Sequence, residues 1–167
     1  MARPPNPMDA RRARLVAADL LSRRAWTRAE LTRRLCRRGA TPEVAADVAA
    51  DLVARGHLDD AAFARHWVET RAERGYGVAR LRAELRQRGV APRLIDAAIA
   101  VLGPSGALAG ARAVAERRLP ALRGLEPERA AARLRDHLLR RGYAAGIAMR
   151  VVREALGARP DPPTLIE

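Results

Sequence analysis

One short phrase occurs three times in this chain of 167 residues. It reads RRLCRRGATPEV at 33–44, AELRQRGVAPRL at 83–94 and DHLLRRGYAAGI at 136–147. Each copy has a leucine four residues before a glycine, an arginine directly before that glycine, and a new apolar-periodic run after it. The copies lie about 50 residues apart, and a regular spacing of this length is typical of a repeat protein.

Helix stop and start signals surround these glycines. A glycine after basic residues is typical of a helix C-terminus, because glycine adopts the left-handed cap conformation easily and the cations face the negative end of the helix dipole. Thr27 and Glu30 form a capping box, the reciprocal pair found at helix starts. Thr41 and Pro42 mark another start, with proline at the first helical position. The pattern predicts helix, glycine and helix in every copy.

These signals predict an all-α protein of three tandem three-helix repeats that form an elongated body, straight or curved. One repeat buries little apolar surface by itself, so neighbouring repeats are expected to stack. In the third repeat, GPSG at 103–106 is predicted to be a loop before a helix that begins near Ala107. The expected repeats are 9–56, 57–103 and 104–157, between a disordered leader at 1–8 and a disordered tail at 158–167.

The charge indicates an anionic partner. The formal net charge is +13, and all 32 basic residues are arginine. The excess lies in the first and third repeats, while the middle repeat is nearly neutral. A surface of this kind attracts polyanions or an acidic protein face. The absence of lysine excludes Schiff-base chemistry and the GxxxxGK phosphate loop.

Residue types that carry catalysis are scarce. Cys36 is the only cysteine, so no intrachain disulfide can form. The histidines and acids at 57–66 match no zinc or iron ligand spacing, and Asp59 is explained as a helix cap. We therefore predict no enzyme, no metal and no cofactor. The chain shows no secretory signal and no apolar run long enough to span a membrane, which predicts a soluble, cytoplasmic protein.

The segment GHLDDAAFARHWVETRAERGYGVARLRAELRQRGV at 56–90 resembles the signature of the RecX family of recombination regulators. The features that carry the resemblance are the paired acids Asp59 and Asp60, then Phe63, the glycines of RGYG, and the leucines that lead to RGV. The flanking repeats resemble the family as well, over about residues 10–157. The chain departs from the family in having no lysine and a slightly longer third repeat.

The resemblance implies a cytoplasmic bacterial protein that takes part in DNA repair and the SOS response. Such proteins bind the RecA–DNA filament along its groove and inhibit its recombinase, ATPase and co-protease activities, and no catalysis is attributed to them. On this basis the expected partners are the RecA filament and, weakly and without sequence preference, DNA phosphates. We expect a monomer. The residues predicted to bind the partner are Arg23, Arg24, Arg28, Arg33, Arg37, Asp60, Arg71, Arg74, Arg80, Arg82 and Arg86.

The residues alone leave a second function open, namely a sequence-independent nucleic-acid-binding protein that has no recombinase partner. Tight binding to bare DNA with a steep salt dependence would favour this alternative. Two further interpretations concern single positions. Arg38, Arg88 and Arg141 occupy the same place before the three glycines, where compensation of the helix dipole explains them without a ligand. Trp26 and Tyr76 are predicted to pack as hydrophobic staples at helix starts.

Overall fold

The structure is a computed structural model and describes residues 8–157. Within this range the chain is helical and contains no strand, apart from a single isolated bridge between Met8 and Ala40. The predicted all-α helical-repeat fold is confirmed. In chain order the helices are α1 Ala10–Arg23, α2 Arg28–Arg37, α3 Pro42–Ala54, α4 Asp60–Glu73, α5 Val78–Gln87, α6 Pro92–Ala100, α7 Gly103–Arg118, the 3-10 helix η1 Leu119–Leu122, α8 Pro127–Arg140 and α9 Ala145–Gly157.

The chain divides into two compact units. The first unit contains the chain up to Trp67 together with Glu84–Ala98, and the second contains Val68–Ala83 together with the chain from Ile99 onward. Helices α4 and α5 therefore each contribute residues to both units.

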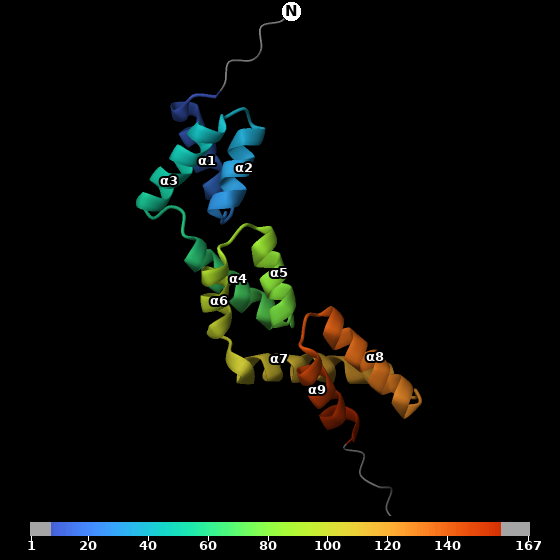
Figure 1. The fold of residues 1–167 in the computed structure, drawn as a ribbon. Helices are drawn as coiled ribbons and strands as arrows, with labels where there is room; N and C mark the ends of the chain where they lie inside the picture. Colours follow the sequence, from blue (N-terminus) through green and yellow to red (C-terminus); the bar gives the residue numbers. More distant parts are fainter. Residues whose placement is uncertain (1–7, 158–167) are drawn as a thin grey trace, which may run out of the picture. The chain divides into compact units, whose positions relative to one another are not determined.

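The core of the first unit lies between α1, α2 and α3 (Figure 1). Leu31 and Leu35, one turn apart on α2, are fully buried against Val48 of α3 and Leu20 of α1. Full burial of a leucine side chain stabilises a fold by about 1.5–3 kcal/mol. The leucine that precedes the first repeat glycine is thus a core residue of this unit.

Side-chain caps begin α1, α2 and α3, and those of Thr27 and Thr41 were predicted from the sequence. The Thr27 hydroxyl accepts a hydrogen bond from the Glu30 N–H, and the Glu30 carboxylate accepts one from the Thr27 N–H, which completes the capping box. Asp9 accepts from the N–H of Arg12, and Thr41 accepts from the N–H of Val44. These bonds satisfy donors that a helix start otherwise leaves unpaired.

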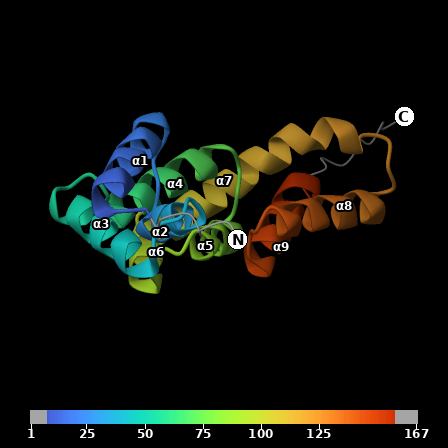
Figure 2. The ribbon, with the colours of Figure 1, turned by 90° about the horizontal axis from the view of Figure 1, so that it is seen from above.

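The core of the second unit lies between α7, α8 and α9, which Figure 2 shows from above. Leu134 and Leu138 of α8 are fully buried and pack with Val151 of α9 and Val114 of α7. Helix α8 is four residues longer than α2 and α5, and its first residue is Pro127.

The prediction that GPSG at 103–106 forms a loop is wrong. Helix α7 begins at Gly103, so these four residues are its first turn. Proline is compatible with this position, because the first turn of a helix does not use the N–H that proline lacks. The glycine, proline and serine of this segment are common in turns, but here they form the start of a helix that has no side-chain cap.

The end of the second repeat phrase packs against the start of α2 inside the first unit. The Thr27 hydroxyl donates a 2.7 Å hydrogen bond to the carbonyl of Arg88, and Thr27 is fully buried. A side chain at Gly89 would collide with the Cβ of Ala29. The glycine therefore allows the close approach of two helix ends that lie 61 residues apart in the sequence.

The third phrase makes the corresponding contact inside the second unit. Gly77 N–H donates to the carbonyl of Arg141 (2.8 Å), and Ala79 N–H donates to the carbonyl of Gly142 (3.0 Å). A backbone donor from Gly77 thus replaces the hydroxyl of Thr27. We call these two contacts the first junction, between the start of α2 and the end of α5, and the second junction, between the start of α5 and the end of α8.

At the first phrase, Met8 makes the contact that a helix start makes at the other two. Met8 N–H donates a 2.9 Å hydrogen bond to the carbonyl of Gly39, and the Met8 side chain is 7% exposed within the core of the first unit. The predicted disordered leader is therefore wrong at residue 8, because this residue is bound and buried. The remainder of that leader and the predicted tail lie outside the described residues.

No single helix among residues 8–157 is long and apolar enough to cross a membrane. Only α6 and the segment Gly103–Leu122, which meet at a bend of 73°, reach the required length and composition when they are taken together.

Substitution of Gly77 by alanine tests the close packing of the second junction. An added Cβ would overlap the backbone of Gly142 and Tyr143, where no flexible side chain can move aside. We expect Gly77→Ala to lower the free energy of unfolding by about 1–3 kcal/mol. Gly146→Ala is the control, because nothing lies within 4 Å of its Cβ position. Urea denaturation measures both, and an equal effect of the two variants would contradict this packing.

Candidate functional site

Three of the predicted partner-binding residues line one groove in the first unit. Arg28 and Arg33 from α2 and Asp60 from the start of α4 lie around a groove of about 500 Å³. Arg37 lies one turn beyond Arg33, so the two guanidinium groups share a face of α2. Both side chains are exposed and form no ion pair with any residue between 8 and 157, which leaves their charges available to a ligand.

Asp60 has a structural role inside this groove. Its carboxylate Oδ1 accepts a 2.8 Å hydrogen bond from the backbone N–H of Arg28 at the start of α2. The carboxylate also lies at the positive end of the α2 dipole, where a negative charge is stabilising. The prediction that Asp60 binds the partner stays a prediction, and this contact accounts for the residue without one.

The two predicted arginines at the end of α1 are engaged within the chain. Arg23 forms an exposed ion pair with Asp19 at 2.8 Å. Arg24 lies 3.5 Å above the ring of Trp26 and 3.4 Å from the carboxylate of Glu30. An exposed pair such as Arg23 and Asp19 contributes little stability.

The remaining predicted residues lie on α5 or near the end of α4. Arg71 and Arg80 both lie over the ring of Tyr76, at 5.4 and 4.2 Å from its centroid. Arg74 is exposed directly after α4, and Arg86 is exposed on α5. Arg82 is half-buried on the same helix. The structure therefore brings Arg71 and Arg80 together in the second unit, whereas Arg86 belongs to the first.

Arg88 has a role that the sequence analysis missed. Its guanidinium forms a 2.5 Å ion pair with Glu30 and lies 3.9 Å above the ring of Trp67, which stacks on Phe63. Helix-dipole compensation alone is thus an incomplete explanation of this position, because the side chain binds the preceding repeat. The signal that the sequence offered for this role is that Arg88 and Arg141 each directly precede a repeat glycine.

Arg141 makes the corresponding contacts in the second unit. Its Nη1 donates to the carbonyl of Arg74 at 2.8 Å and to that of Gly75 at 3.4 Å, and its guanidinium lies 5.4 Å from the centroid of Tyr76. Tyr76 is therefore surrounded by guanidinium groups, a role beyond the predicted hydrophobic staple.

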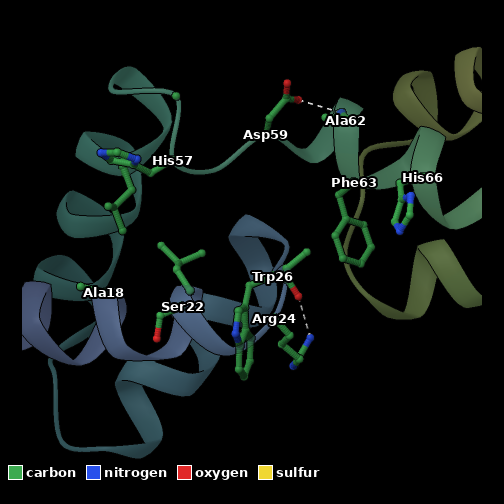
Figure 3. Close-up of a pocket in the computed structure, with 13 residues that line it drawn as sticks. Ala18, Ser22, Arg24, Trp26, His57, Asp59, Ala62, Phe63 and His66 are labelled. Atoms are coloured by element: carbon green, nitrogen blue, oxygen red, sulfur yellow. Dashed lines mark hydrogen bonds between the residues drawn. The ribbon is translucent and has the colours of Figure 1, made fainter.

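An open pocket of about 780 Å³ in the first unit contains part of the histidine and acid segment 57–66 (Figure 3). His57 lies on one side of it and His66 on the other, beside Phe63. Asp59 accepts hydrogen bonds from the N–H groups of Ala61 and Ala62, as a helix cap does. Among residues 8–157, no three histidine, cysteine or acidic side chains converge as metal ligands.

Basic residues also set the electrostatics of α8. Burial lowers the pKa of His137, and the charges of Arg141, Arg118 and Arg140 lower it further. On α9, Glu154 accepts hydrogen bonds from Arg112 and Arg150, which lower its pKa to about 2. Glu154 thus remains ionised and links α9 to α7.

The fold and this surface define a class of protein, namely a basic helical-repeat protein whose exposed arginines are suited to binding an anionic partner. Residues 13–52 match the model of the first three-helix domain of RecX, and residues 59–99 match that of the second. The regulatory protein RecX of Thermobifida fusca (strain YX) is 46% identical over 148 residues, which cover 88% of this chain and 80% of the relative. The chain belongs to the RecX family.

Further relatives and solved structures agree with this assignment. The regulatory protein RecX of Streptomyces coelicolor (strain ATCC BAA-471 / A3(2) / M145) is 39% identical over 155 residues, which cover 92% of this chain and 81% of the relative. The crystal structure of RecX from Lactobacillus salivarius superposes with a TM-score of 0.81 at 16% identity and covers 88% of this chain and 96% of that one. Another crystal structure of a regulatory protein RecX gives 0.76 at 21% identity, over 90% and 72%. At these identities the structures show a common fold.

Arg88→Gln is expected to lower the free energy of unfolding by about 1–3 kcal/mol, because it removes a half-buried ion pair to Glu30 and the contact with Trp67. Arg38→Gln is the matched control, since Arg38 has the same place before its glycine but is exposed and makes no such pair within residues 8–157. It should change stability by less than about 0.5 kcal/mol. Comparable losses in urea denaturation would show that Arg88 does not hold the junction.

Acidification is expected to weaken the second unit through His137. Its folded pKa lies below the ordinary 6.5, so below that pH the unfolded chain binds a proton more readily than the folded chain. The free energy of unfolding should therefore fall as pH decreases below 6.5, by at most about 1.4 kcal/mol per pH unit and less where solvent screens the charges. His137→Gln should flatten this dependence in denaturation experiments, whereas the exposed control His57→Gln should not. Identical pH profiles for wild type and His137→Gln would contradict this origin.

Proposed function

We propose that this protein binds the nucleoprotein filament that RecA recombinase forms on DNA, lies along the groove of the filament, and inhibits its recombinase, ATPase and co-protease activities. Membership of a family of regulatory proteins supports this function. The observation that carries it is the exposed, unpaired face of Arg33 and Arg37 on α2, because such a face gains most from an anionic partner.

The mechanism requires binding without chemistry on a substrate. The arginines contact acidic protein surface or DNA phosphates on neighbouring filament subunits, and the occupied groove then excludes a second duplex. Binding across subunits also resists the motions that ATP hydrolysis needs. In this proposal the protein is a cytoplasmic, non-enzymatic monomer that acts by occupying a surface.

The test reverses two charges on α2. We expect Arg33→Glu with Arg37→Glu to raise the concentration needed for half-inhibition of filament ATPase by about tenfold or more, because reversal replaces two attractions with repulsions. The matched control is Arg11→Glu with Arg12→Glu, which makes the same charge change on exposed residues of α1. Both variants must retain wild-type helicity by circular dichroism. Unchanged inhibition by the α2 variant would remove this face from the contact.

Co-sedimentation separates this function from the alternative of general nucleic-acid binding. The regulator should bind assembled RecA filaments more tightly than bare DNA at the same salt concentration. Equal binding to both, with a steep salt dependence on bare DNA, would favour the alternative. Equal losses of inhibition in the α1 and α2 variants would likewise indicate attraction by total charge rather than by the α2 face.

A further inference from the structure

We propose that the groove between α2, α3 and the start of α4 is a docking site for protein and that nucleic acid does not occupy it. This is the groove of about 500 Å³ that Arg28, Arg33 and Asp60 line in the first unit. The inference rests on the proposed function, in which the arginines contact either acidic protein surface or DNA phosphates. It assigns this groove to a protein surface that presents an acidic side chain beside a basic one.

Charged side chains of both signs line the groove without pairing with one another. Arg28 and Arg33 are exposed, and neither guanidinium group forms an ion pair with any residue between 8 and 157. Arg33 reaches the first junction, where its Nη1 atom lies 3.9 Å from the point at which a Cβ of Gly89 would stand. Asp60 likewise forms no ion pair in the described part of the chain. Each of the three charges is therefore available to a group of opposite sign from outside.

The carboxylate of Asp60 is fixed in the groove by a bond that uses one of its two oxygens. Oδ1 accepts the 2.8 Å hydrogen bond from the backbone N–H of Arg28. Oδ2 accepts no hydrogen bond from any residue in the range 8–157, and the side chain is partly exposed. Because both oxygens of a carboxylate are acceptors, this group can still receive a donor from a partner. The groove thus offers a fixed negative group together with two positive ones.

A DNA backbone matches only part of this charge pattern. Each phosphodiester of a strand carries a negative charge and no hydrogen-bond donor, so it can pair with Arg28 or Arg33 but not with Asp60. In a groove of this size, a phosphate bound to the arginines also lies close to the Asp60 carboxylate, and like charges repel. Asp60 therefore weakens the binding of a phosphate at this place.

A protein surface supplies groups for all three charges. A carboxylate accepts hydrogen bonds from the guanidinium fork of Arg28 or Arg33, and a neighbouring lysine or arginine donates to Oδ2 of Asp60. The other lining residues are alanine, glycine and threonine, so no bulky side chain blocks the approach of a partner. Charges of both signs also determine the orientation of the partner, because the reverse orientation brings like charges together.

Asp60→Asn separates the two occupants, because they predict changes of opposite sign. The amide oxygen of asparagine can accept from the Arg28 N–H, so the variant loses the charge of Asp60 and keeps the hydrogen bond. With protein in the groove, the affinity for assembled RecA filaments should fall by about fivefold, although the variant is more positive than wild type. Co-sedimentation at constant salt measures this affinity. A gain of affinity would place phosphate in the groove and overturn the proposal.

Asp47→Asn is the matched control. It makes the same charge change on an exposed residue of α3 that does not line the groove and forms no ion pair within residues 8–157. It should leave the filament affinity unchanged or raise it, because it only increases the net positive charge. Both variants should retain wild-type helicity by circular dichroism. Equal losses of affinity in Asp60→Asn and Asp47→Asn would contradict a specific contact at Asp60.

Arg28→Gln tests the positive side of the groove without recombinase. It removes one guanidinium group and keeps the backbone N–H that binds Asp60. Binding of a fluorescein-labelled oligothymidylate is followed by fluorescence anisotropy over a salt series. Arg11→Gln makes the same charge change on an exposed residue of α1, and both variants should give the same slope of log K against log salt. A slope lower by about 0.7 in Arg28→Gln alone would reveal a phosphate contact in the groove and overturn the proposal.

Failure of this inference and failure of the proposed function give different results. Tighter filament binding by Asp60→Asn, or a reduced salt slope in Arg28→Gln, overturns the assignment of the groove while the wild-type protein still inhibits the filament. Absence of wild-type binding to filaments overturns the proposed function together with the inference that rests on it.

Discussion

The main constraint on this molecule is a hydrogen-bonded contact between consecutive repeats. It joins the backbone carbonyl at the end of the second helix of one repeat to the start of the second helix of the repeat before it. In the first unit the Thr27 hydroxyl binds the carbonyl of Arg88, and in the second unit the N–H of Gly77 binds the carbonyl of Arg141. A helix C-terminus leaves its last carbonyls without intrahelical donors. The repeats use these free carbonyls for stacking. A side chain at Gly89 or Gly142 would collide with the neighbouring helix start, whereas Gly39 has open space around it and is required by its positive φ of 100°.

Much of this arrangement could be predicted from the sequence, because local signals determine helix ends. The capping box at Thr27 and Glu30 and the glycine stop at Gly39 depend on residues within one turn of each other. The same local reasoning failed at GPSG, where proline and glycine suit the first turn of a helix as well as they suit a loop. Composition alone cannot separate these two cases.

The candidate site was harder to predict because its contacts join residues distant in the sequence. Nothing local in the sequence links Arg28 and Arg33 to Asp60, and folding places the three residues around one groove. The sequence shows Arg88 and Arg141 only as equivalent positions, because nothing near them reveals the partner that lies 58 or 67 residues away. Compensation of the helix dipole explained both positions from nearby residues alone, whereas the contact between repeats is visible only in the structure.

The bond between Met8 and Gly39 pairs the carbonyl at the end of the second helix of the first repeat. An open stack exposes an acceptor at one edge, and any chain segment with a free donor could extend it. Here a residue of the same polypeptide fills that acceptor, and its buried side chain closes the apolar layer beneath. The carbonyl of Gly39 is therefore already paired and does not present a free acceptor to another chain segment.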